Sequence, residues 1–308
     1  MTSPPDLALL FPGQGAERPG MGLELAEHSP AARALLDLAG EESGVDVLGL
    51  LRRGGPDWNR TAIIQPLLVA VTLGVLGELT KAGITAKAVA GHSLGEIGAC
   101  CAAGCLDPPA AIALAATRGR LMAREAAEHP GGMIALLEGD ERRATEAATR
   151  GAAHGPLVVA GCNGPDQWVL SGALPALRSV AATHRCRWLP AAGAWHSSAM
   201  AGAVDELREL LRAGIRAPDQ APFVSAANGQ VVTSAEQVTE LLAGQLVQPF
   251  RWDRTLATLR DMGIEHVVTL GPAKVLRGLV RSNLGSAVTV HQADRPTDLV
   301  RVIEQVGP

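Results

Sequence analysis

The sequence predicts an α/β fold, with a larger unit built around a parallel-rich sheet and a smaller inserted unit of the ferredoxin-like βαββαβ type. The chain has 308 residues, 47% of them hydrophobic, which is enough to bury a full core. A short apolar strand at 86–90 passes through a glycine-flanked turn into a helical stretch at 96–103, as in open α/β sheets. Beyond Gly131-Gly132, strands and helices follow in the order βαββαβ.

The first part of the chain is predicted to contain a strand, a loop and then helices. An apolar run at 7–10 ends in the Pro- and Gly-containing segment 11–15, so we expect a strand followed by a loop. Helical periodicity follows at 21–38 and again at 65–81, and we expect each of these helices to pack one face inward. The periodic apolar residues of the second helix are Leu68, Val71, Val75 and Leu79.

The inserted unit is predicted to span residues 129–196, within a larger unit made of 1–128 and 197–308. Its expected strands lie at 133–138, 157–162, 167–171 and 186–190, and its expected helices at 140–150 and 173–184. The larger unit is expected to resume with a helix at 200–211, strands at 222–226 and 266–270, and a last helix beginning near Lys274.

Composition argues against several classes of function. The net charge is −4 and lysine occurs only at 81, 87 and 274, so the clustered basic surface that nucleic-acid binding needs is not expected. No run of roughly 18 apolar residues and no secretion signal is present, which predicts a cytoplasmic protein without a membrane segment. The cysteines lack paired C-x-x-C spacing, so we expect reduced core thiols and no metal site. They are Cys100, Cys101, Cys105, Cys162 and Cys186.

The segment Gly91-His92-Ser93-Leu94-Gly95 is a candidate nucleophile turn. A sharp turn between strand and helix lifts the Ser93 hydroxyl out of the fold, and flanking glycines let the backbone pass close by. The following helix points its N-terminal N–H groups back at the turn, so the Leu94 N–H can face an oxygen that becomes negative during acyl transfer. The pattern alone occurs by chance in a chain with 35 glycines, but the flanking strand and helix favour a nucleophilic serine in an α/β-hydrolase-like unit.

A serine hydroxyl needs a base to take its proton, and eight histidines are candidates. His92 adjoins Ser93, but neighbouring side chains diverge in a tight turn, which favours a structural role. His196 follows Gly193-Ala194-Trp195 at the exit of the expected insert, where a loop can lie over Ser93. The remaining histidines occur where ordinary surface histidines are expected: His28, His129, His154, His184, His266 and His291.

Seven motifs along the chain resemble those of malonyl-CoA:acyl carrier protein transacylases and of the acyltransferase domains of polyketide synthases. They are Phe11–Gly15, Gln65-Pro66, Gly91–Glu96, Arg118–Met122, Ala194–Ser197, Gln245 with Pro249 and Trp252, and Gly271-Pro272 before Lys274-Val275-Leu276. The resemblance covers nearly the whole chain and implies an acyltransferase.

The resemblance implies a role for each matching residue. Ser93 corresponds to the acyl-bearing nucleophile and His196 to its base, while the backbone N–H groups of Gln14 and Leu94 correspond to the oxyanion hole. Gln245 corresponds to the residue whose main-chain carbonyl orients the histidine. No acidic residue stands out as a third member, so a Ser-His dyad is the expected arrangement.

Arg118 bears on the substrate class. By residue type alone, Arg118 and Arg120 would be solvated helix charges. The resemblance assigns Arg118 to the free carboxylate of the acyl group, which a planar guanidinium can bind through two parallel hydrogen bonds. An aliphatic Leu94 and an aromatic Trp195, where the family more often has Phe, imply malonyl over methylmalonyl. Other residues expected at the pocket are Gln65 and His92.

The predicted reaction is therefore transfer of a malonyl group from coenzyme A to the phosphopantetheine thiol of an acyl carrier protein, by a ping-pong route through an ester on Ser93. No permanent cofactor is implied, because the coenzyme A thioester is itself a substrate. The pathway is fatty acid or polyketide synthesis, the latter including a trans-acting role, and the family is usually monomeric. An acidic carrier should meet local positive charge, either on Lys274, Arg277 and Arg281 along one helix face or on Arg185 and Arg187; each set also fits an ordinary solvated face.

Three alternatives stay open on the sequence. An acyl hydrolase or editing thioesterase would use the same Ser-His pair with water as acceptor, although hydrolytic relatives tend to lose the arginine at 118. A transacylase for a different acyl unit would keep the pair and change the pocket. A non-catalytic carrier-docking module would not need Ser93, His196, Gln14 and Arg118 intact. A phosphate-binding loop at 13–15 is not favoured, since neither G-x-G-x-x-G nor a Lys-Ser/Thr ending is present.

Overall fold

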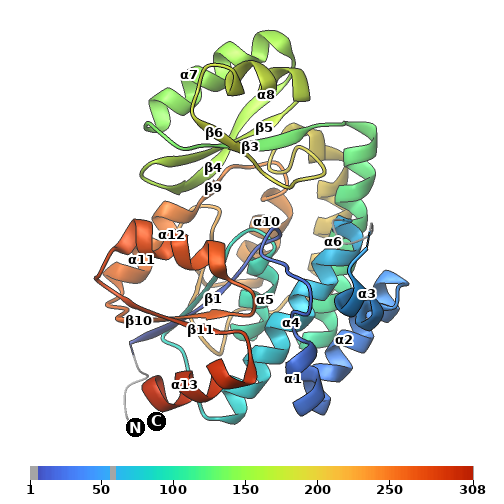
Figure 1. The fold of residues 1–308 in the computed structure, drawn as a ribbon, viewed down its shortest axis with the longest axis vertical. Helices are drawn as coiled ribbons and strands as arrows, with labels where there is room; N and C mark the ends of the chain where they lie inside the picture. The colour runs from blue at the N-terminus through green and yellow to red at the C-terminus, as the bar shows by residue number, and fades with distance from the viewer. Residues whose placement is uncertain (1–5, 56–59, 308) are drawn as a thin grey trace.

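A computed structural model describes residues 6–55 and 60–307, and it confirms the α/β prediction with two sheets (Figure 1). The main sheet has the strand order β11-β10-β1-β2-β7-β8. Its pairings are parallel except for the antiparallel hairpin of β7 and β8. The strands are β1 (Leu7–Phe11), β2 (Ala88–Gly91), β7 (Phe223–Val224), β8 (Val231–Val232), β10 (His266–Leu270) and β11 (Thr289–Ala293).

The central strands of this sheet are buried on both faces, because helices surround it. All five residues of β1 are buried, as a continuous apolar strand between two layers requires. The helices of the larger part are α1 (Leu23–His28), α2 (Pro30–Ser43), α3 (Val47–Arg53), α4 (Thr61–Lys81), α5 (Gly95–Ala102), α6 (Pro108–Glu128), α9 (Val204–Gly214), α10 (Ala235–Gly244), α11 (Trp252–Asp261), α12 (Lys274–Leu284) and α13 (Pro296–Val306), with a 3₁₀ segment η3 (Ser198–Ala203).

The second sheet lies at one end of the molecule, at the top of Figure 1, with two helices on one face. Its strand order is β6-β3-β5-β4-β9, and the first four strands pair antiparallel in the order expected of a βαββαβ unit. Its elements are β3 (Gly132–Leu136), α7 (Glu141–Gly151), η2 (Ala152–His154), β4 (Leu157–Gly164), β5 (Gln167–Gly172), α8 (Leu174–Ala181), β6 (Cys186–Trp188) and β9 (Phe250–Arg251). Strand β9 comes from outside the expected insert and pairs parallel to β4. The unit boundaries at 129 and 196 stay a prediction.

Two helix predictions need correction. The expected helix at 21–38 is divided into α1 and α2, because Ser29 is extended, its hydroxyl accepts from Ala32 N, and Pro30 begins the second helix. The helix near Lys274 is not the last one, since α12 is followed by β11 and α13.

Helix α4 is buried on nearly every side rather than on one face. It begins at Thr61 instead of Gln65, and every residue from 63 to 75 is buried. By length and composition it could cross a membrane, but 78% of its apolar window is buried inside the protein, where α2 and α6 pack against it. Such burial is what a core helix of a folded domain shows.

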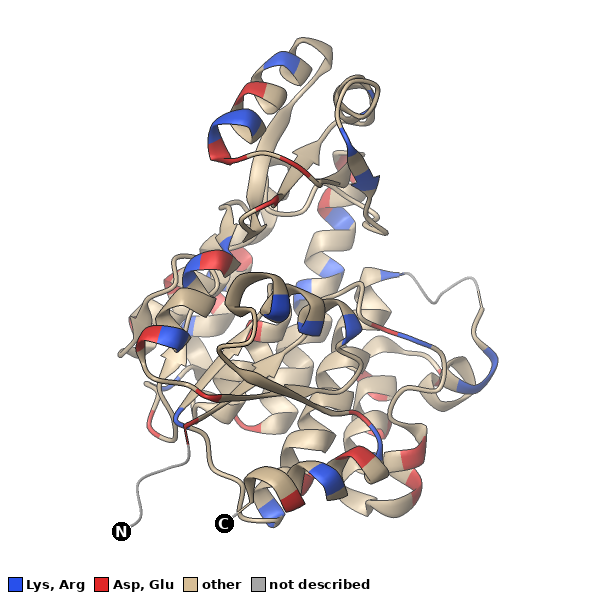
Figure 2. Ribbon diagram, turned by 60° about the vertical axis from the view of Figure 1, so that its left-hand side comes forward, with Lys and Arg blue, Asp and Glu red and all other residues tan. Residues whose placement is uncertain are grey.

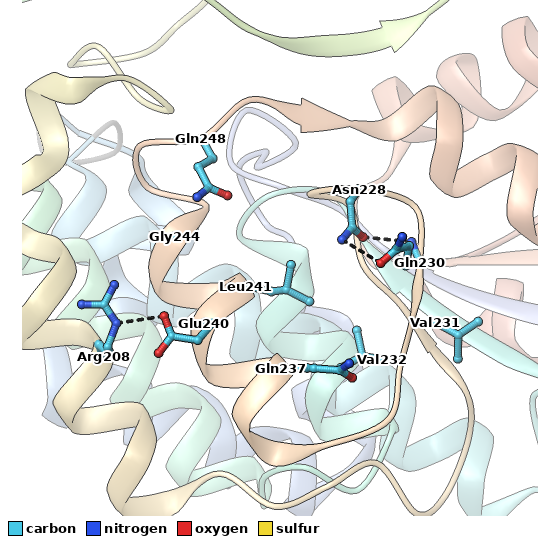
Figure 3. Close-up of a pocket in the computed structure, with 10 residues that line it drawn as sticks. All are labelled: Arg208, Asn228, Gln230, Val231, Val232, Gln237, Glu240, Leu241, Gly244 and Gln248. Atoms are coloured by element: carbon cyan, nitrogen blue, oxygen red, sulfur yellow. Dashed lines mark hydrogen bonds and ion pairs between the residues drawn. The ribbon is translucent and has the colours of Figure 1, made fainter.

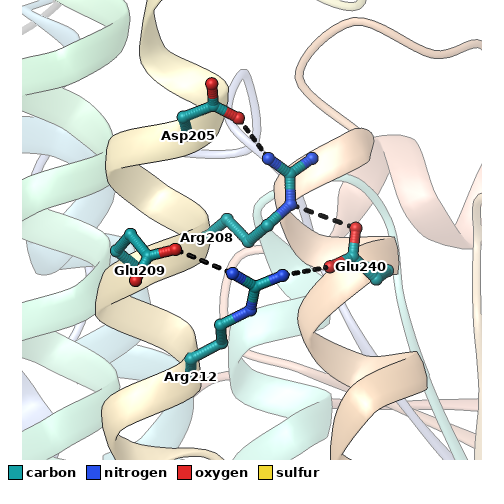
Figure 4. Close-up of polar contacts among 5 residues, drawn as sticks. All are labelled: Asp205, Arg208, Glu209, Arg212 and Glu240. Atoms are coloured by element: carbon teal, nitrogen blue, oxygen red, sulfur yellow. Dashed lines mark hydrogen bonds and ion pairs between the residues drawn. The ribbon is translucent and has the colours of Figure 1, made fainter.

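Ion pairs connect the helix that follows the His196 loop with the helix that precedes Gln245. Arg208 and Arg212 of α9 both reach Glu240 of α10, with Nε–Oε2 and Nη2–Oε1 distances of 3.1 and 3.4 Å (Figure 4). Asp205 and Glu209 complete the network from within α9. The network therefore joins α9 to α10.

The five cysteines are free thiols. Cys100, Cys105 and Cys162 are buried, as expected of core thiols, whereas Cys101 and Cys186 are partly exposed.

Candidate active site

Ser93 lies in the sharp turn between β2 and α5. Its φ of 51° is in the left-handed region, which non-glycine residues rarely adopt. A Cβ on Gly91 would lie 2.0 Å from the main-chain carbon of Gly95, and one on Gly95 would lie 2.1 Å from the carbonyl oxygen of Phe11. Only glycine fits at both positions, in agreement with the close backbone approach expected from the sequence.

The structure brings His196 to Ser93. The Ser93 Oγ and His196 Nε2 atoms are 2.9 Å apart, and His196 Nδ1 is 2.6 Å from the main-chain oxygen of Gln245. A carbonyl oxygen only accepts hydrogen bonds, so Nδ1 carries the proton and Nε2 is left to accept from the Ser93 hydroxyl. Gln245 is thus positioned as the resemblance implied.

Burial and a nearby charge keep His196 neutral. The side chain lies in a desolvated pocket and faces the Arg118 cation, and these two effects lower the pKa of His196 to about 3. A neutral imidazole at ordinary pH can take a proton from a serine, which a protonated one cannot.

Arg118 is buried in the same cavity and carries its charge there. It is 3% exposed, and burial lowers its pKa only to about 10. Its Nη1 donates to Gln65 Oε1 at 2.8 Å and its Nη2 to Gln245 Oε1 at 2.7 Å. A cation held by two neutral amide oxygens keeps its attraction for an anionic group of a ligand.

A cavity of about 300 Å³ connects these residues. The expected site residues on its wall are Gln14, His92, Ser93, Leu94, Arg118, Trp195 and His196. Gln65 and Gln245 are buried just behind the wall, where both contact Arg118. Gln65, expected at the pocket, thus acts on it through the guanidinium rather than as a lining residue.

His92 has a structural environment. Its Nε2 is 2.8 Å from Asn163 Oδ1, and its ring meets those of Phe250 and Trp252 edge-on at 4.9 and 5.3 Å. Burial lowers its pKa. Phe250 also meets the His196 ring, at 5.2 Å. The sequence analysis did not identify Phe250 as a site residue. Its position between two motif residues, Pro249 and Trp252, could have indicated that it lies near the site.

Two parts of the molecule contribute to the mouth of the cavity. Arg187 and Trp188 of β6 line one side, and Val275, Leu276 and Leu279 of α12 line another. Trp188 and Val275 are 45% and 53% exposed, so apolar surface is open to a ligand here. Of the expected docking residues on α12, Lys274 and Arg281 are exposed, whereas Arg277 is half-buried and donates to Gln292. Basic and acidic residues are interspersed over the molecule in the view of Figure 2.

Two other polar clusters in the described part of the chain differ from this site. A cavity of about 310 Å³ behind Gly244 is lined mainly by polar side chains (Figure 3), and none of its described polar groups is both buried and unpaired. Glu125, Glu128 and His129 place ligand atoms within 4.8 Å of one another, but two of the three are exposed, and exposed acidic groups often gather without a metal.

Comparisons with known proteins identify similar chains. Residues 8–296 match the acyl transferase domain family. A malonyl CoA-acyl carrier protein transacylase of Mycobacterium tuberculosis is 38% identical over 304 residues, covering 95% of this chain and 98% of the relative. One from Bacillus subtilis is 32% identical over 299 residues, covering 94% of each chain.

Solved structures of similar proteins share the fold. The structure of MCAT from Mycobacterium tuberculosis matches with a TM-score of 0.88 at 35% identity, over 98% of this chain and 99% of that one. A malonyl-transacylase in complex with its type II PKS acyl-carrier protein matches with a TM-score of 0.90 at 28% identity, over 97% and 99% of the two chains.

Proposed function

The chain belongs to the acyl transferase domain family, within the malonyl-CoA:acyl carrier protein transacylases, and we propose that it moves a malonyl group from coenzyme A to an acyl carrier protein. The supporting observation is the arrangement of three side chains around one cavity. A serine hydroxyl lies 2.9 Å from an imidazole nitrogen, and a buried guanidinium lines the same space.

In the first half-reaction, His196 Nε2 takes the proton of the Ser93 hydroxyl while Ser93 Oγ bonds to the thioester carbon of malonyl-CoA. The backbone N–H groups of Gln14 and Leu94, both at the cavity wall, would donate to the oxygen that becomes negative. The carbon–sulfur bond then breaks, the coenzyme A thiolate takes the proton from His196, and the malonyl ester stays on Ser93.

In the second half-reaction, the phosphopantetheine thiol of the carrier gives its proton to His196 and attacks the ester carbonyl. Collapse of the tetrahedral intermediate returns the proton to Ser93 Oγ and leaves the malonyl group on the carrier as a thioester. The chemistry needs only these side chains and the thioester substrate, with no permanent cofactor.

Selection for a malonyl group is proposed to rest on Arg118, Leu94 and Trp195. Arg118 would bind the free carboxylate, and the Trp195 ring, 7% exposed on the cavity wall, limits room beside the α-carbon. A pocket of this kind discriminates one methyl group by about 1–3 kcal/mol, so malonyl is favoured over methylmalonyl without absolute exclusion.

Fatty acid synthesis is the proposed pathway, in the cytoplasm, with the chain acting as a monomer on an acidic carrier. A second candidate is polyketide synthesis, in which the chain would act in trans. The similar malonyl-transacylase in complex with a type II PKS acyl-carrier protein favours it as an alternative. The relatives described above are transacylases, which favours transfer to a carrier over the acyl hydrolase alternative.

The test is stepwise loading and transfer. After mixing with malonyl-CoA, the intact mass of the wild type should rise by one malonyl group, and added phosphopantetheinylated carrier should remove it. Ser93→Ala should gain no mass, because it lacks the accepting oxygen. Malonate released to water faster than it passes to the carrier would favour a hydrolase, and malonyl loading of Ser93→Ala would refute the assigned nucleophile.

A further inference from the structure

Glu96 is a buried carboxylate directly behind the candidate site that the reaction steps leave unused. It lies in the first turn of α5, three residues after Ser93, and is 1% exposed. Its Oε1 accepts from Ser225 Oγ at 2.8 Å and from the main-chain N–H of Ala226 at 2.7 Å, and its Oε2 accepts from Gln245 Nε2. Burial raises its pKa to about 7, so the fold holds this carboxyl where ionisation is unfavourable.

The contact with Glu96 fixes which way the Gln245 amide points. Gln245 Nε2 donates to the Glu96 Oε2, while Ser225 and Ala226 donate to Oε1, so the NH₂ group of the Gln245 side chain faces Glu96. The amide oxygen is thereby turned to the other side, where it accepts from Arg118 Nη2 at 2.7 Å. The main-chain oxygen of the same residue accepts a hydrogen bond from His196 Nδ1. Gln245 therefore connects Glu96 to both functional groups of the cavity.

Gln65 supports the other end of the guanidinium in the same manner. Its Nε2 donates to Thr61 Oγ1 at 2.8 Å, which turns its oxygen toward Arg118 Nη1. Arg118 is thus held between two amide oxygens, each oriented by an acceptor behind it. The Gln65 side has a neutral hydroxyl behind it, and only the Gln245 side has a carboxylate, whose charge also opposes the loss of the Arg118 proton on burial.

We infer that Glu96 is a positioning residue for dicarboxylic acyl groups: through the side-chain amide of Gln245 it aims Arg118 at the free carboxylate of the substrate. The inference rests on the proposed function and deepens it, because it assigns substrate selectivity to a residue outside the cavity. In this role the Glu96 side chain acts through Gln245 and contacts neither the substrate nor the Ser93 hydroxyl.

Glu96→Gln tests the orientation argument with almost no change of shape. The new amide has one acceptor end, while donors face both ends: the Ser225 hydroxyl and the Ala226 main-chain N–H at one, and the Gln245 NH₂ at the other. The backbone donor cannot turn around, so the acceptor end stays with Ala226 and the NH₂ group of the new residue meets that of Gln245. The side-chain amide of Gln245 must then rotate. Its NH₂ group, instead of its oxygen, would face the N–H groups of Arg118.

The readout is the ratio of the second-order rate constants for acylation by malonyl-CoA and by acetyl-CoA, followed by intact-protein mass in quenched samples. Glu96→Gln should lower this ratio by about tenfold or more, a factor that corresponds to about 1.4 kcal/mol. If Glu96→Gln does not fold, Glu96→Asp gives the same comparison, because the shorter carboxylate cannot reach both Ala226 and Gln245.

Two further variants separate positioning from a loss of stability. Ser225→Ala removes a hydrogen bond from the other carboxylate oxygen, so it should lower the melting temperature and leave the ratio within about twofold of wild type. In an Arg118→Ala background, adding Glu96→Gln should leave the ratio unchanged, because the residue through which Glu96 acts is gone.

The inference would be overturned by a folded Glu96→Gln variant with the wild-type ratio, or by an equal fall of the ratio with and without Arg118. A wild type that takes no malonyl group at all would overturn the proposed function together with this inference. Malonyl loading by the wild type with no effect of Glu96→Gln would overturn the inference alone.

Discussion

Ser93 and His196 share an unusual backbone conformation. Among the described residues, they are the non-glycine positions with positive φ, at 51° and 58°. Such conformations cost about 1–3 kcal/mol each and persist only where the surroundings impose them. The glycines around Ser93 allow its tight turn, and the Gln245 carbonyl holds the His196 ring, so the hydroxyl and the imidazole meet before any substrate binds.

The lowered pKa of His196 predicts activity at unusually acidic pH. A histidine of ordinary pKa, near 6.5, would be mostly protonated at about pH 5.5 and would lose about tenfold in rate as a base. His196, with a pKa of about 3, stays neutral there. Acylation by acetyl-CoA should therefore change by less than about twofold between about pH 7.5 and 5.5.

Acetyl-CoA is the suitable probe because its acyl group has no carboxylate to titrate or to bind Arg118. The measurement is the second-order acylation rate constant of the wild type across this range, with circular dichroism at each pH to confirm folding. A tenfold fall centred near pH 6.5 would contradict a neutral, desolvated His196.

The roles of residues that belong to a recognisable motif were predictable from the sequence. Roles that depend on contacts with distant segments were not. The Gly91–Gly95 pattern and the loop before His196 have a mechanical meaning that can be read without coordinates, and the resemblance added Arg118 and Gln245. Glu96 directly follows this pattern in the sequence. Its role, however, depends on which atoms of Gln245 and Ala226 face its carboxyl group. Such orientation follows from packing of distant segments, which sequence order does not reveal.

At the scale of elements, the close contact between β1 and α5 brings the nucleophile turn against the sheet. Gly95, the first residue of α5, leaves no room for a side chain, since a Cβ there would lie 2.1 Å from the Phe11 oxygen. Gly77, inside α4, has open space around its Cβ position. The two glycines therefore offer a matched pair of Gly→Ala changes in helices.

We expect Gly95→Ala to lower the free energy of unfolding by about 1–3 kcal/mol, as overpacking does, and to abolish most of the malonyl loading because the turn must shift. Gly77→Ala should raise the free energy of unfolding by about 0.5–1 kcal/mol and keep the loading rate. Urea unfolding and intact-mass loading measure the two effects. Wild-type loading by Gly95→Ala would contradict the role assigned to this close contact.

Helix α4 shows where periodicity is insufficient. Its apolar residues do recur at helical spacing, which predicted the helix, but between Leu68 and Val75 the intervening residues are apolar or small as well, and the whole stretch from 63 to 75 is buried. A pattern of spacing reveals one buried face; burial on all sides depends on the neighbours α2 and α6, which come from other parts of the chain. The division at Ser29-Pro30 was readable, since Ser before Pro is a helix start signal.

At the scale of the molecule, the cavity lies where the small sheet meets the larger part. The wall combines residues of β6, at 186–188, with residues of α12, at 274–284, which are far apart in the sequence. The βαββαβ order was predictable from the alternation of short strands and helices. The addition of β9 to that sheet was not, because a two-residue strand has no periodicity of its own, and its pairing with β4 brings Phe250 against the rings of His92 and His196.

The mouth of the cavity predicts how a carrier protein approaches. An acidic carrier that inserts a phosphopantetheine arm must pass the exposed end of α12, and the whole chain, with a net charge of −4, gives it no general attraction. Arg281, two residues after Leu279 of the cavity lining, is the better probe of charge on this helix, because Arg277 is partly buried and donates to Gln292. Charge reversal at Arg281 therefore changes the surface and little else.

We expect Arg281→Glu to raise the KM for carrier protein in the transfer half-reaction by about fivefold at low salt, with the difference shrinking as salt screens the charges. The measurement starts from malonyl-loaded protein, so that coenzyme A binding does not enter. Arg301→Glu is the matched control: it makes the same change of net charge on α13, where Arg301 is 73% exposed and distant in sequence from the cavity lining. It should leave the KM within about twofold of wild type. An equal effect of the two variants would mean that only net charge matters, and no effect of Arg281→Glu would place the carrier elsewhere.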